Sequence, residues 1–207
     1  GLWAQAMVNK VRSHPLRPGN LTLQDLSSYK AQKREVLCFD YSVKLPKRDF
    51  KVCGFPPPSS GVLTMGQILG ILNQTPAAPM PLIQGLPSSD WLHFYNESAK
   101  LAFADRAQFI ADPDFVAAPG GRWENLLNPN YLIQRSRLIG NQSMKIAQAG
   151  QPVSQPSAWA PMPHQTEYGT SHISVIDAQG RAVAMTSTIE AAFGSRRMVT
   201  TDTSRQG

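Results

Sequence analysis

The spacing of apolar residues predicts that the first three quarters of the chain are mainly helical. Apolar positions recur every three or four residues over 2–14, which predicts an amphipathic helix, and over 63–72, which predicts a largely buried one. Thr22-Leu23-Gln24-Asp25 has capping-box spacing and should begin a short helix that continues to Tyr29. Asn128-Pro129 places a cap residue before a proline that suits the first turn of a further helix.

A long helix is expected from Ser88 to Ile110, after a proline-rich linker at 75–87. Ser88, Ser89 and Asp90 are its candidate N-caps. One face of this helix would carry a row of apolar residues, namely Trp91, Tyr95, Ala99, Ala102 and Phe103. Residues 148–168 show no periodicity and contain four prolines, which predicts an exposed, irregular segment.

Two strand-like runs, 36–41 and 50–55, carry the two cysteines of the chain, Cys38 and Cys53. If the two strands are neighbours, a cross-strand disulfide can form, and two free buried thiols fit the pattern equally well. Two cysteines are too few for a four-cysteine zinc site or for a disulfide-rich scaffold.

A second pair of strands is predicted over 170–176 and 182–190, where apolar and polar residues alternate around the turn Asp177-Ala178-Gln179-Gly180-Arg181. With the turn centred on Gln179, opposed residues have numbers that sum to 358. Thr170 then faces Thr188 and His172 faces Thr186, with Cβ atoms roughly 4.5–5.5 Å apart. A shift of one residue would break this pairing, so the register is itself a prediction.

Gly169-Thr170 stands where an irregular segment meets the first strand of this hairpin, and two interpretations of it are open. It can be an ordinary loop-to-strand junction. Alternatively, the Thr170 hydroxyl can attack the preceding carbonyl, cut the chain and leave Thr170 as a new N-terminus. Its free α-amine, with a pKa near ~7.7–8.0, could then deprotonate its own hydroxyl.

The composition excludes a disordered chain and a membrane-spanning protein, and it argues against a nucleic-acid-binding protein. Hydrophobic residues make up 42% of the 207 positions, which excludes wholesale disorder, and no apolar run approaches the ~20 residues of a membrane span. The net charge is +6, but the basic residues are scattered and interrupted by acidic ones. Nucleic-acid binding is therefore not expected, because it relies on clustered Lys and Arg.

Several motifs in order along the chain resemble the γ-glutamyltranspeptidase family. The block from Thr170 to Asp177, followed by Gly180-Arg181-Ala182-Val183, Thr186-Ser187-Thr188-Ile189-Glu190 and Phe193-Gly194-Ser195-Arg196, is similar to the start of the family's small subunit. Upstream, Pro56-Pro57-Pro58-Ser59-Ser60-Gly61, Ala104-Asp105-Arg106 and Asp112-Pro113-Asp114-Phe115 resemble motifs of its large subunit. These blocks run from Pro56 to Arg196, and the resemblance as a whole spans nearly the whole chain.

The resemblance implies an α+β chain that forms part of an αββα N-terminal-nucleophile hydrolase sandwich. It would be mostly helical in 1–150, with strand pairs near 36–55 and a hairpin at 171–190. Residues 1–169 would end the large subunit and residues 170–207 would begin the small one, with self-cleavage between Gly169 and Thr170.

The resemblance also assigns roles to particular residues. Thr170 takes the position of the nucleophile, and Thr188 that of the threonine that hydrogen-bonds it. Glu190 stands where many members have an Asn that touches the glutamyl group, and its carboxylate could bind the substrate's α-ammonium. The Pro56–Gly61 block is expected to be structural, as is Asp105-Arg106, which is predicted to be an ion pair with a packing role. His172 is expected to stabilise local structure and not to act as a base.

The family mechanism implies an acyl-enzyme formed from a γ-glutamyl amide such as glutathione, which water or an amino-acid or peptide acceptor then releases. No metal and no organic cofactor is implied. Partners would be these small molecules, together with the remaining segments of the same precursor or a second copy of the chain. The family setting is periplasmic or secreted. Alternatives are a cephalosporin acylase, a poly-γ-glutamate processing enzyme, or a non-catalytic structural fragment.

The first residue is Gly and not Met, so the chain is expected to begin inside a longer gene product. The family's oxyanion-hole and glutamyl-binding motifs would follow Gly207. We therefore expect this chain alone to be inactive, its Gly169–Thr170 bond to be intact, and its unmet strand edges to favour association.

Overall fold

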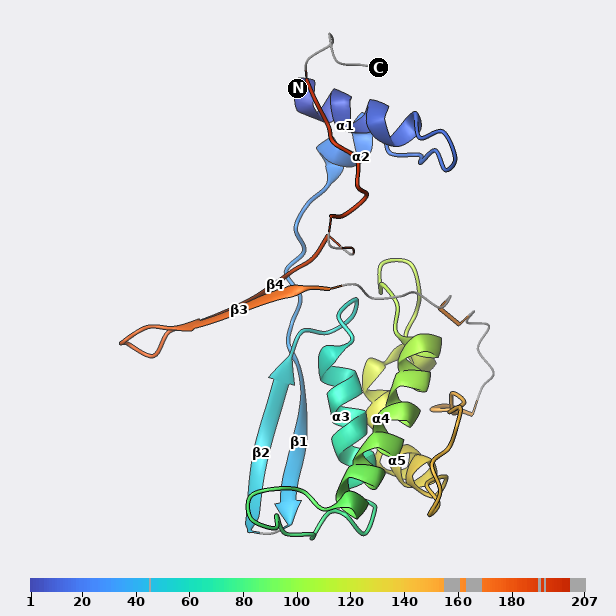
Figure 1. Ribbon diagram of the computed structural model, residues 1–207, viewed down its shortest axis with the longest axis vertical. Helices are drawn as coiled ribbons and strands as arrows, with labels where there is room; N and C mark the ends of the chain where they lie inside the picture. The colour runs from blue at the N-terminus through green and yellow to red at the C-terminus, as the bar shows by residue number, and fades with distance from the viewer. Residues whose placement is uncertain (45, 155–160, 163–168, 190, 192, 202–207) are drawn as a thin grey trace. The chain divides into compact units, whose positions relative to one another are not determined.

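The computed structural model describes all residues except 45, 155–160, 163–168, 190, 192 and 202–207 (Figure 1). The chain forms two compact units. The larger unit comprises residues 33–163, and the smaller unit combines residues 1–32 with 164–207. These units differ from the predicted subunits, which are separated by a cleavage site, so the division at residues 169 and 170 stays a prediction.

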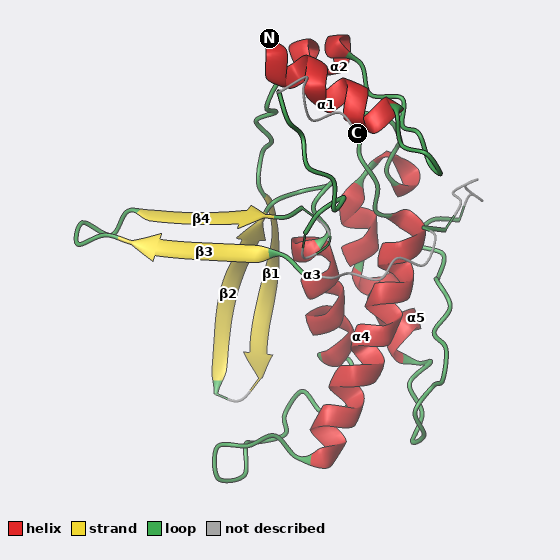
Figure 2. Ribbon diagram, turned by 45° about the horizontal axis from the view of Figure 1, so that its top comes forward, coloured by secondary structure: helices red, strands yellow, loops and turns green. Residues whose placement is uncertain are grey.

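Among its described residues, the larger unit contains three helices and one hairpin (Figures 1 and 2). The helices are α3 (Gly61–Leu72), α4 (Ser89–Phe109) and α5 (Pro129–Ser136), and two short 3₁₀ turns, Pro119–Gly121 and Trp123–Leu127, lie between the last two. They pack around two apolar clusters. The first contains Leu37, Val62, Leu63, Phe109, Leu126 and Tyr131, and the second Ile71, Leu101 and Leu132.

The hairpin of the larger unit pairs β1 (Leu37–Lys44) with β2 (Lys47–Gly54) in antiparallel register. Both strands run further toward the turn than the sequence pattern predicts. Cys38 lies opposite Cys53, and the two sulfur atoms form a disulfide. The structure thereby decides between the two alternatives that the sequence left open.

The predicted caps begin the helices as expected. The Ser88 hydroxyl accepts a hydrogen bond from the Trp91 N–H at 3.1 Å, and the Asn128 side chain accepts one from the Asn130 N–H at 2.9 Å. These side chains satisfy backbone donors that the first turn of a helix leaves without an intrahelical partner.

The buried face of α4 shares only Ala102 with the predicted one. Tyr95 and Phe103 are exposed, whereas the residues turned into the core are Glu97, Ser98, Leu101, Ala102, Asp105 and Phe109. Apolar periodicity misplaces this face because three of the buried residues are polar. Such groups are buried without a large penalty only when they are hydrogen-bonded, and each of the three is: Ser98, for example, donates to the Phe94 carbonyl at 2.7 Å.

Asp105 is the centre of the buried polar network. The expectation that it pairs with Arg106 is wrong. Its ion pair is with Arg135 of α5, at 3.1 Å, and not with its neighbour Arg106. It also accepts hydrogen bonds from the Gln67 amide at 2.8 Å, the Tyr131 hydroxyl at 2.7 Å and the Gly150 N–H at 2.9 Å. Burial raises the pKa of Asp105 despite these donors. The predicted packing role of Asp105 is therefore confirmed, with a different cation.

The Pro56–Gly61 block and Arg106 prove to be connected. The Arg106 guanidinium donates to the Ser60 hydroxyl at 2.9 Å, just before α3 begins. Pro57 is fully buried. The two upstream motifs thus meet where α4 packs beside α3, as expected for structural segments.

The smaller unit contains α1 (Leu2–Arg12), α2 (Leu23–Ser28), β3 (Ser171–Ile176) and β4 (Ala182–Ser187). Thr22 and Asp25 form the predicted capping box of α2: Asp25 N–H donates to Thr22 Oγ1 at 3.1 Å, and Thr22 N–H donates to Asp25 Oδ2 at 2.8 Å. The α+β class is confirmed, and the described strands form two separate two-stranded sheets. No helix among the described residues is both long and apolar enough to cross a bilayer.

Candidate active site

The β3–β4 hairpin adopts the predicted register. Ser171 pairs with Ser187, His172 with Thr186 and Ser174 with Ala184. The turn that sets this register is built by Asp177, whose Oδ1 accepts hydrogen bonds from the backbone N–H groups of Gln179 at 3.0 Å and Arg181 at 2.9 Å. These bonds and the Arg181 side chain hold the pKa of Asp177 below its usual value. Gly180 has φ +78°, as this turn requires.

His172 lies in the middle of the hairpin and bridges its hydroxyl groups. Nδ1 lies 2.8 Å from Thr186 Oγ1 on β4, and Nε2 lies 3.0 Å from Ser174 Oγ on β3. Both ring nitrogens are thus engaged within the hairpin. This arrangement is that of a residue that ties the two strands together, as the sequence predicts.

The open end of the hairpin contains a pocket of about 450 Å³. The described residues that line it are Gly169, Thr170, Ser171, Ser187, Thr188, Ile189 and Ala191. Thr170 is an exposed residue and is not part of either apolar core cluster. The register, continued one residue beyond Ser171 and Ser187, brings Thr170 opposite Thr188. Glu190, the predicted substrate-binding residue, lies outside the described residues.

The backbone at Gly169 and the side chain of Thr188 are in direct contact. The Thr188 hydroxyl donates a hydrogen bond to the Gly169 carbonyl at 3.1 Å. Gly169 has φ +145°, a conformation that side-chain-bearing residues rarely adopt. The carbonyl on the N-terminal side of Thr170 is therefore held at the pocket by the side chain of the residue that follows β4.

Hydroxyl groups supply the chemistry of this pocket, because none of its seven described lining residues has an ionisable side chain. A hydroxyl nucleophile needs a base to take its proton. If Thr170 were a chain terminus, its α-amine could serve as that base. No group of three His, Cys, Asp or Glu side chains suited to a metal ion occurs among the described residues.

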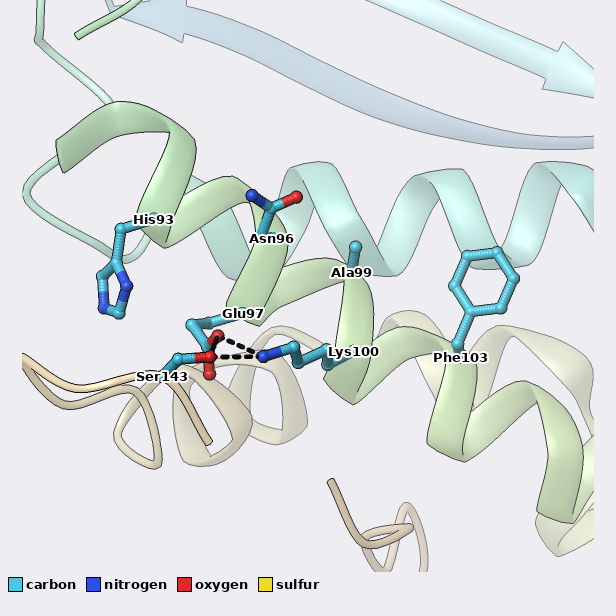
Figure 3. Close-up of a pocket in the computed structure, with 7 residues that line it drawn as sticks. All are labelled: His93, Asn96, Glu97, Ala99, Lys100, Phe103 and Ser143. Atoms are coloured by element: carbon cyan, nitrogen blue, oxygen red, sulfur yellow. Dashed lines mark hydrogen bonds and ion pairs between the residues drawn. The ribbon is translucent and has the colours of Figure 1, made fainter. Parts of the chain in front are cut away.

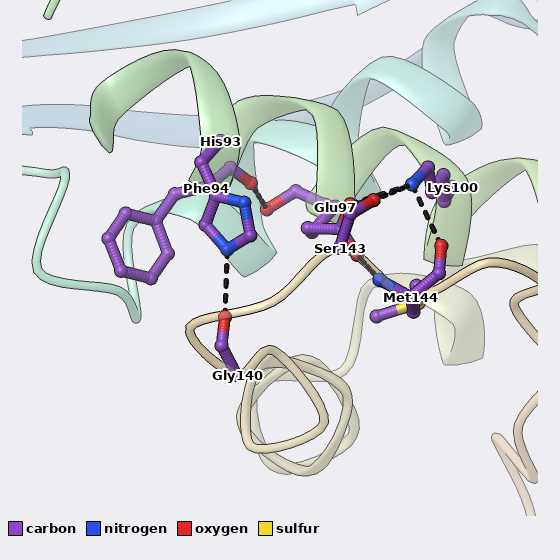
Figure 4. A network of polar contacts seen from close by, with 8 residues as sticks. His93, Phe94, Glu97, Lys100, Gly140, Ser143 and Met144 are labelled. Carbon is purple, nitrogen blue, oxygen red and sulfur yellow. Dashed lines mark hydrogen bonds and ion pairs between the residues drawn. The ribbon is translucent and has the colours of Figure 1, made fainter. Parts of the chain in front are cut away.

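Sequence reasoning missed a second pocket, of about 520 Å³, on α4 of the larger unit (Figure 3). Glu97 is almost completely buried there, and its carboxylate accepts hydrogen bonds from Lys100 and Ser143 and from the Met144 N–H (Figure 4). His93 Nε2 lies 2.7 Å from the Gly140 carbonyl. The only sequence signal is the Glu-to-Lys spacing of three residues, which occurs on many solvated helices.

The charges of this second pocket are mutually compensated. Burial by itself raises the pKa of Glu97, but the hydrogen bonds from Lys100, Met144 and Ser143 outweigh it and hold the pKa below its usual value. Lys100 also donates to the Met144 carbonyl at 2.8 Å. This network holds Ser143 and Met144, in the segment after α5, against α4.

Comparison with known proteins finds the chain similar to the γ-glutamyltranspeptidases. A family model described as gamma-glutamyltranspeptidase matches residues 1–202. The chain is 35% identical over 177 residues to the glutathione hydrolase proenzyme of Escherichia coli K12, which covers 86% of the chain and 27% of that protein. It is 33% identical over 177 residues to the acylase ACY 1 proenzyme of Pseudomonas sp. V22, with the same coverage.

Among solved structures, the Helicobacter pylori γ-glutamyltranspeptidase is similar to the chain in fold. The TM-score is 0.56 at 24% identity, and the match covers 75% of this chain and 40% of that one. The chain spans about a quarter of the length of the two curated relatives just described.

Proposed function

The chain belongs to the γ-glutamyltranspeptidase family, and from that premise we propose that the full-length protein that carries it, the parent protein, transfers or hydrolyses γ-glutamyl groups through Thr170. The observation that carries the proposal is the convergence of Gly169, Thr170 and Thr188 at one solvent-accessible pocket. Gly169 and Thr170 precede β3 and Thr188 follows β4, so all three lie at the open end of the hairpin.

The proposed reaction has three stages. The chain first cleaves itself between Gly169 and Thr170, which creates a free α-amine beside the Thr170 hydroxyl. That hydroxyl, deprotonated by the amine, then attacks the γ-carbonyl of a γ-glutamyl amide, and the amine of the leaving group departs. Water or the amino group of an acceptor finally attacks the acyl-enzyme and restores Thr170. Thr188 donates a hydrogen bond to the nucleophile in the cleaved form.

We assign Glu190 to recognition of the substrate's α-ammonium, because a carboxylate forms a strong charge-assisted hydrogen bond to an ammonium group.

Residues 1–169 and 170–207 would belong to different subunits of the mature protein. The remaining segments of the precursor, or a second copy, would cover the hairpin, whose apolar residues such as Ile173, Val183 and Met185 are more than half exposed. The proposed setting is periplasmic or secreted.

The test is made on the parent protein with two readouts, intact-mass spectrometry for cleavage and turnover of γ-glutamyl-p-nitroanilide for activity. Thr170→Ala should abolish both. Thr170→Ser, which keeps a hydroxyl, should retain both at a lower rate. His172→Gln serves as the control because His172 has no proposed role in the chemistry. Activity that survives Thr170→Ala would exclude this nucleophile, and absence of turnover by the wild-type protein would favour a non-catalytic role.

The similarity to the Pseudomonas acylase supports a second candidate, an acylase with a substrate other than a γ-glutamyl amide, and an amide without an α-amino group is the probe that tests it. Glutaryl-p-nitroanilide differs from γ-glutamyl-p-nitroanilide only in lacking that amino group, so the ratio of the two kcat/KM values distinguishes the candidates. If Glu190 binds the α-ammonium, the γ-glutamyl substrate is preferred and Glu190→Gln removes the preference. A preference for the glutaryl substrate would identify an acylase.

A further inference from the structure

The contact that Thr188 makes in the uncleaved chain indicates an earlier role than the one proposed above. In the finished enzyme this threonine would serve the Thr170 hydroxyl. Before cleavage, however, its hydroxyl donates to the carbonyl oxygen of Gly169, at 3.1 Å. That oxygen belongs to the bond that self-cleavage breaks, and it takes up negative charge as the attack proceeds.

We propose that Thr188 is the oxyanion donor of self-cleavage, and that the backbone conformation of Gly169 presents the carbonyl to it. The inference rests on the proposed function only in taking the Gly169–Thr170 bond as the cleavage site. A donor already placed on the carbonyl needs little reorganisation when the oxyanion forms, and such preorganised donors are worth more at the transition state than in the ground state.

The step balances without any co-reactant except water. Thr170 Oγ attacks the Gly169 carbonyl carbon, a C–O bond forms, and the negative charge moves onto the oxygen that faces Thr188. The intermediate collapses with cleavage of the C–N bond, and the proton from the Thr170 hydroxyl ends on the nitrogen, which becomes the α-amine. Water then hydrolyses the ester and releases the Gly169 carboxylate and the Thr170 hydroxyl.

This order of events gives one hydroxyl two successive uses. While the bond is intact, Thr188 donates to the Gly169 carbonyl. After hydrolysis the Gly169 carboxylate is no longer attached to Thr170, and the Thr188 hydroxyl can turn to Thr170 Oγ across the same pocket.

Gly169 allows the conformational part of the proposal to be tested separately. Apart from its two chain neighbours, a Cβ at this position would meet no atom of the described residues within 4 Å, so Gly169→Ala creates no collision with them. It does, however, disfavour the φ of +145°. Any loss of cleavage in this variant therefore reports the backbone conformation and not overcrowding.

The experiment follows cleavage of newly synthesised parent protein with time, by gel electrophoresis and intact mass. Thr188→Val should slow cleavage about 10²–10³-fold, the usual effect of removing one oxyanion donor. Thr188→Ser keeps the donor and should restore most of the rate. Thr186→Val is the matched control: it makes the same substitution two residues away, where the hydroxyl contacts His172 and not the scissile carbonyl.

Gly169→Ala should cleave more slowly than the wild type although it folds, as judged by circular dichroism. Cleavage of Thr188→Val at the wild-type rate would overturn the role of Thr188. Cleavage of Gly169→Ala at the wild-type rate would overturn the role of the Gly169 backbone conformation. Equal slowing by Thr186→Val would also overturn the proposal, because the effect would then belong to the hairpin as a whole.

A second arm separates this inference from the proposed function. The parent protein is produced as two chains, one that ends at Gly169 and one that begins at Thr170 after removal of an initiator Met, so that no self-cleavage is needed. Turnover by this assembly, together with Thr188-independent cleavage of the single chain, would refute the inference and keep the function. Thr188-dependent cleavage with an inactive two-chain assembly would refute the function and keep the inference.

Discussion

The hydrogen bond between Tyr131 and Asp105 offers a sharp test of the buried network in the larger unit. Tyr131 is 4% exposed and Asp105 is 0% exposed, and their oxygens lie 2.7 Å apart. Burial, together with the Asp105 charge, raises the pKa of Tyr131, so the phenol remains a protonated donor throughout the usual assay range. Tyr131→Phe removes only the hydroxyl and keeps the ring that packs in the apolar core.

The expected loss follows from what Asp105 retains. A hydrogen bond to a charged group contributes about 1.5–3 kcal/mol. In the variant, the Gln67 amide still donates to Asp105 Oδ2, while the Gly150 N–H and Arg135 still contact Oδ1. Because neither oxygen is left without a partner, the loss should fall in the lower half of that range, about 2 kcal/mol.

The measurement is urea unfolding of the 207-residue chain followed by far-ultraviolet circular dichroism, which reports mainly on the helices. With an m-value of roughly 1–3 kcal/mol/M, a loss of about 2 kcal/mol lowers the midpoint by roughly 0.7–2 M. The matched control is Tyr95→Phe on α4. Tyr95 is 37% exposed, stacks on Trp91, and its hydroxyl has no hydrogen-bond partner among the described residues.

The control should leave the free energy of unfolding within about 0.5 kcal/mol of the wild type, as surface substitutions usually do. If Tyr131→Phe is equally harmless, the hydroxyl does not support the Asp105 carboxylate and the reasoning about the network is wrong. If both variants lose the same amount, the effect belongs to tyrosine hydroxyls in general and not to this buried contact.

Three further predictions concern the same unit. An added Cβ at Gly150 would overlap the Tyr131 hydroxyl, so Gly150→Ala should cost about 1–3 kcal/mol and less in the Tyr131→Phe background; strictly additive losses in urea unfolding would contradict this. Reduction of the Cys38–Cys53 disulfide, which closes a loop with a separation of 15 residues, should cost roughly 3 kcal/mol; the urea midpoint should fall with reductant in the wild type and not in a Cys38→Ala/Cys53→Ala variant. The lowered pKa of Glu97 means that its stabilisation is fully present above the ordinary value of 4.5 and is lost as the pH falls through the folded-state pKa. The stability difference between wild type and Glu97→Gln should therefore shrink on acidification, and a difference that stays constant or grows would refute this assignment.

Local signals in the sequence determined most of the secondary structure and the hairpin register at the candidate active site. The caps Ser88 and Asn128 begin their helices as expected because an N-cap depends only on the next three residues. The turn around Gly180 likewise depends on a few neighbouring residues, and a turn sets the register of its hairpin. The placement of Thr170 opposite Thr188 follows from that register.

Contacts between residues far apart in sequence were decided only by the tertiary structure. The core-facing side of α4 includes Glu97 and Asp105, which do not belong to the apolar row that the sequence predicts for this helix. Their burial depends on partners 26 to 47 positions away, such as Tyr131 and the Met144 N–H, that come within reach only when α4 packs against α5 and the segment after it. The choice of Arg135 over the adjacent Arg106 has the same origin, because successive residues on a helix point in different directions and the cation from another helix is the one that faces Asp105.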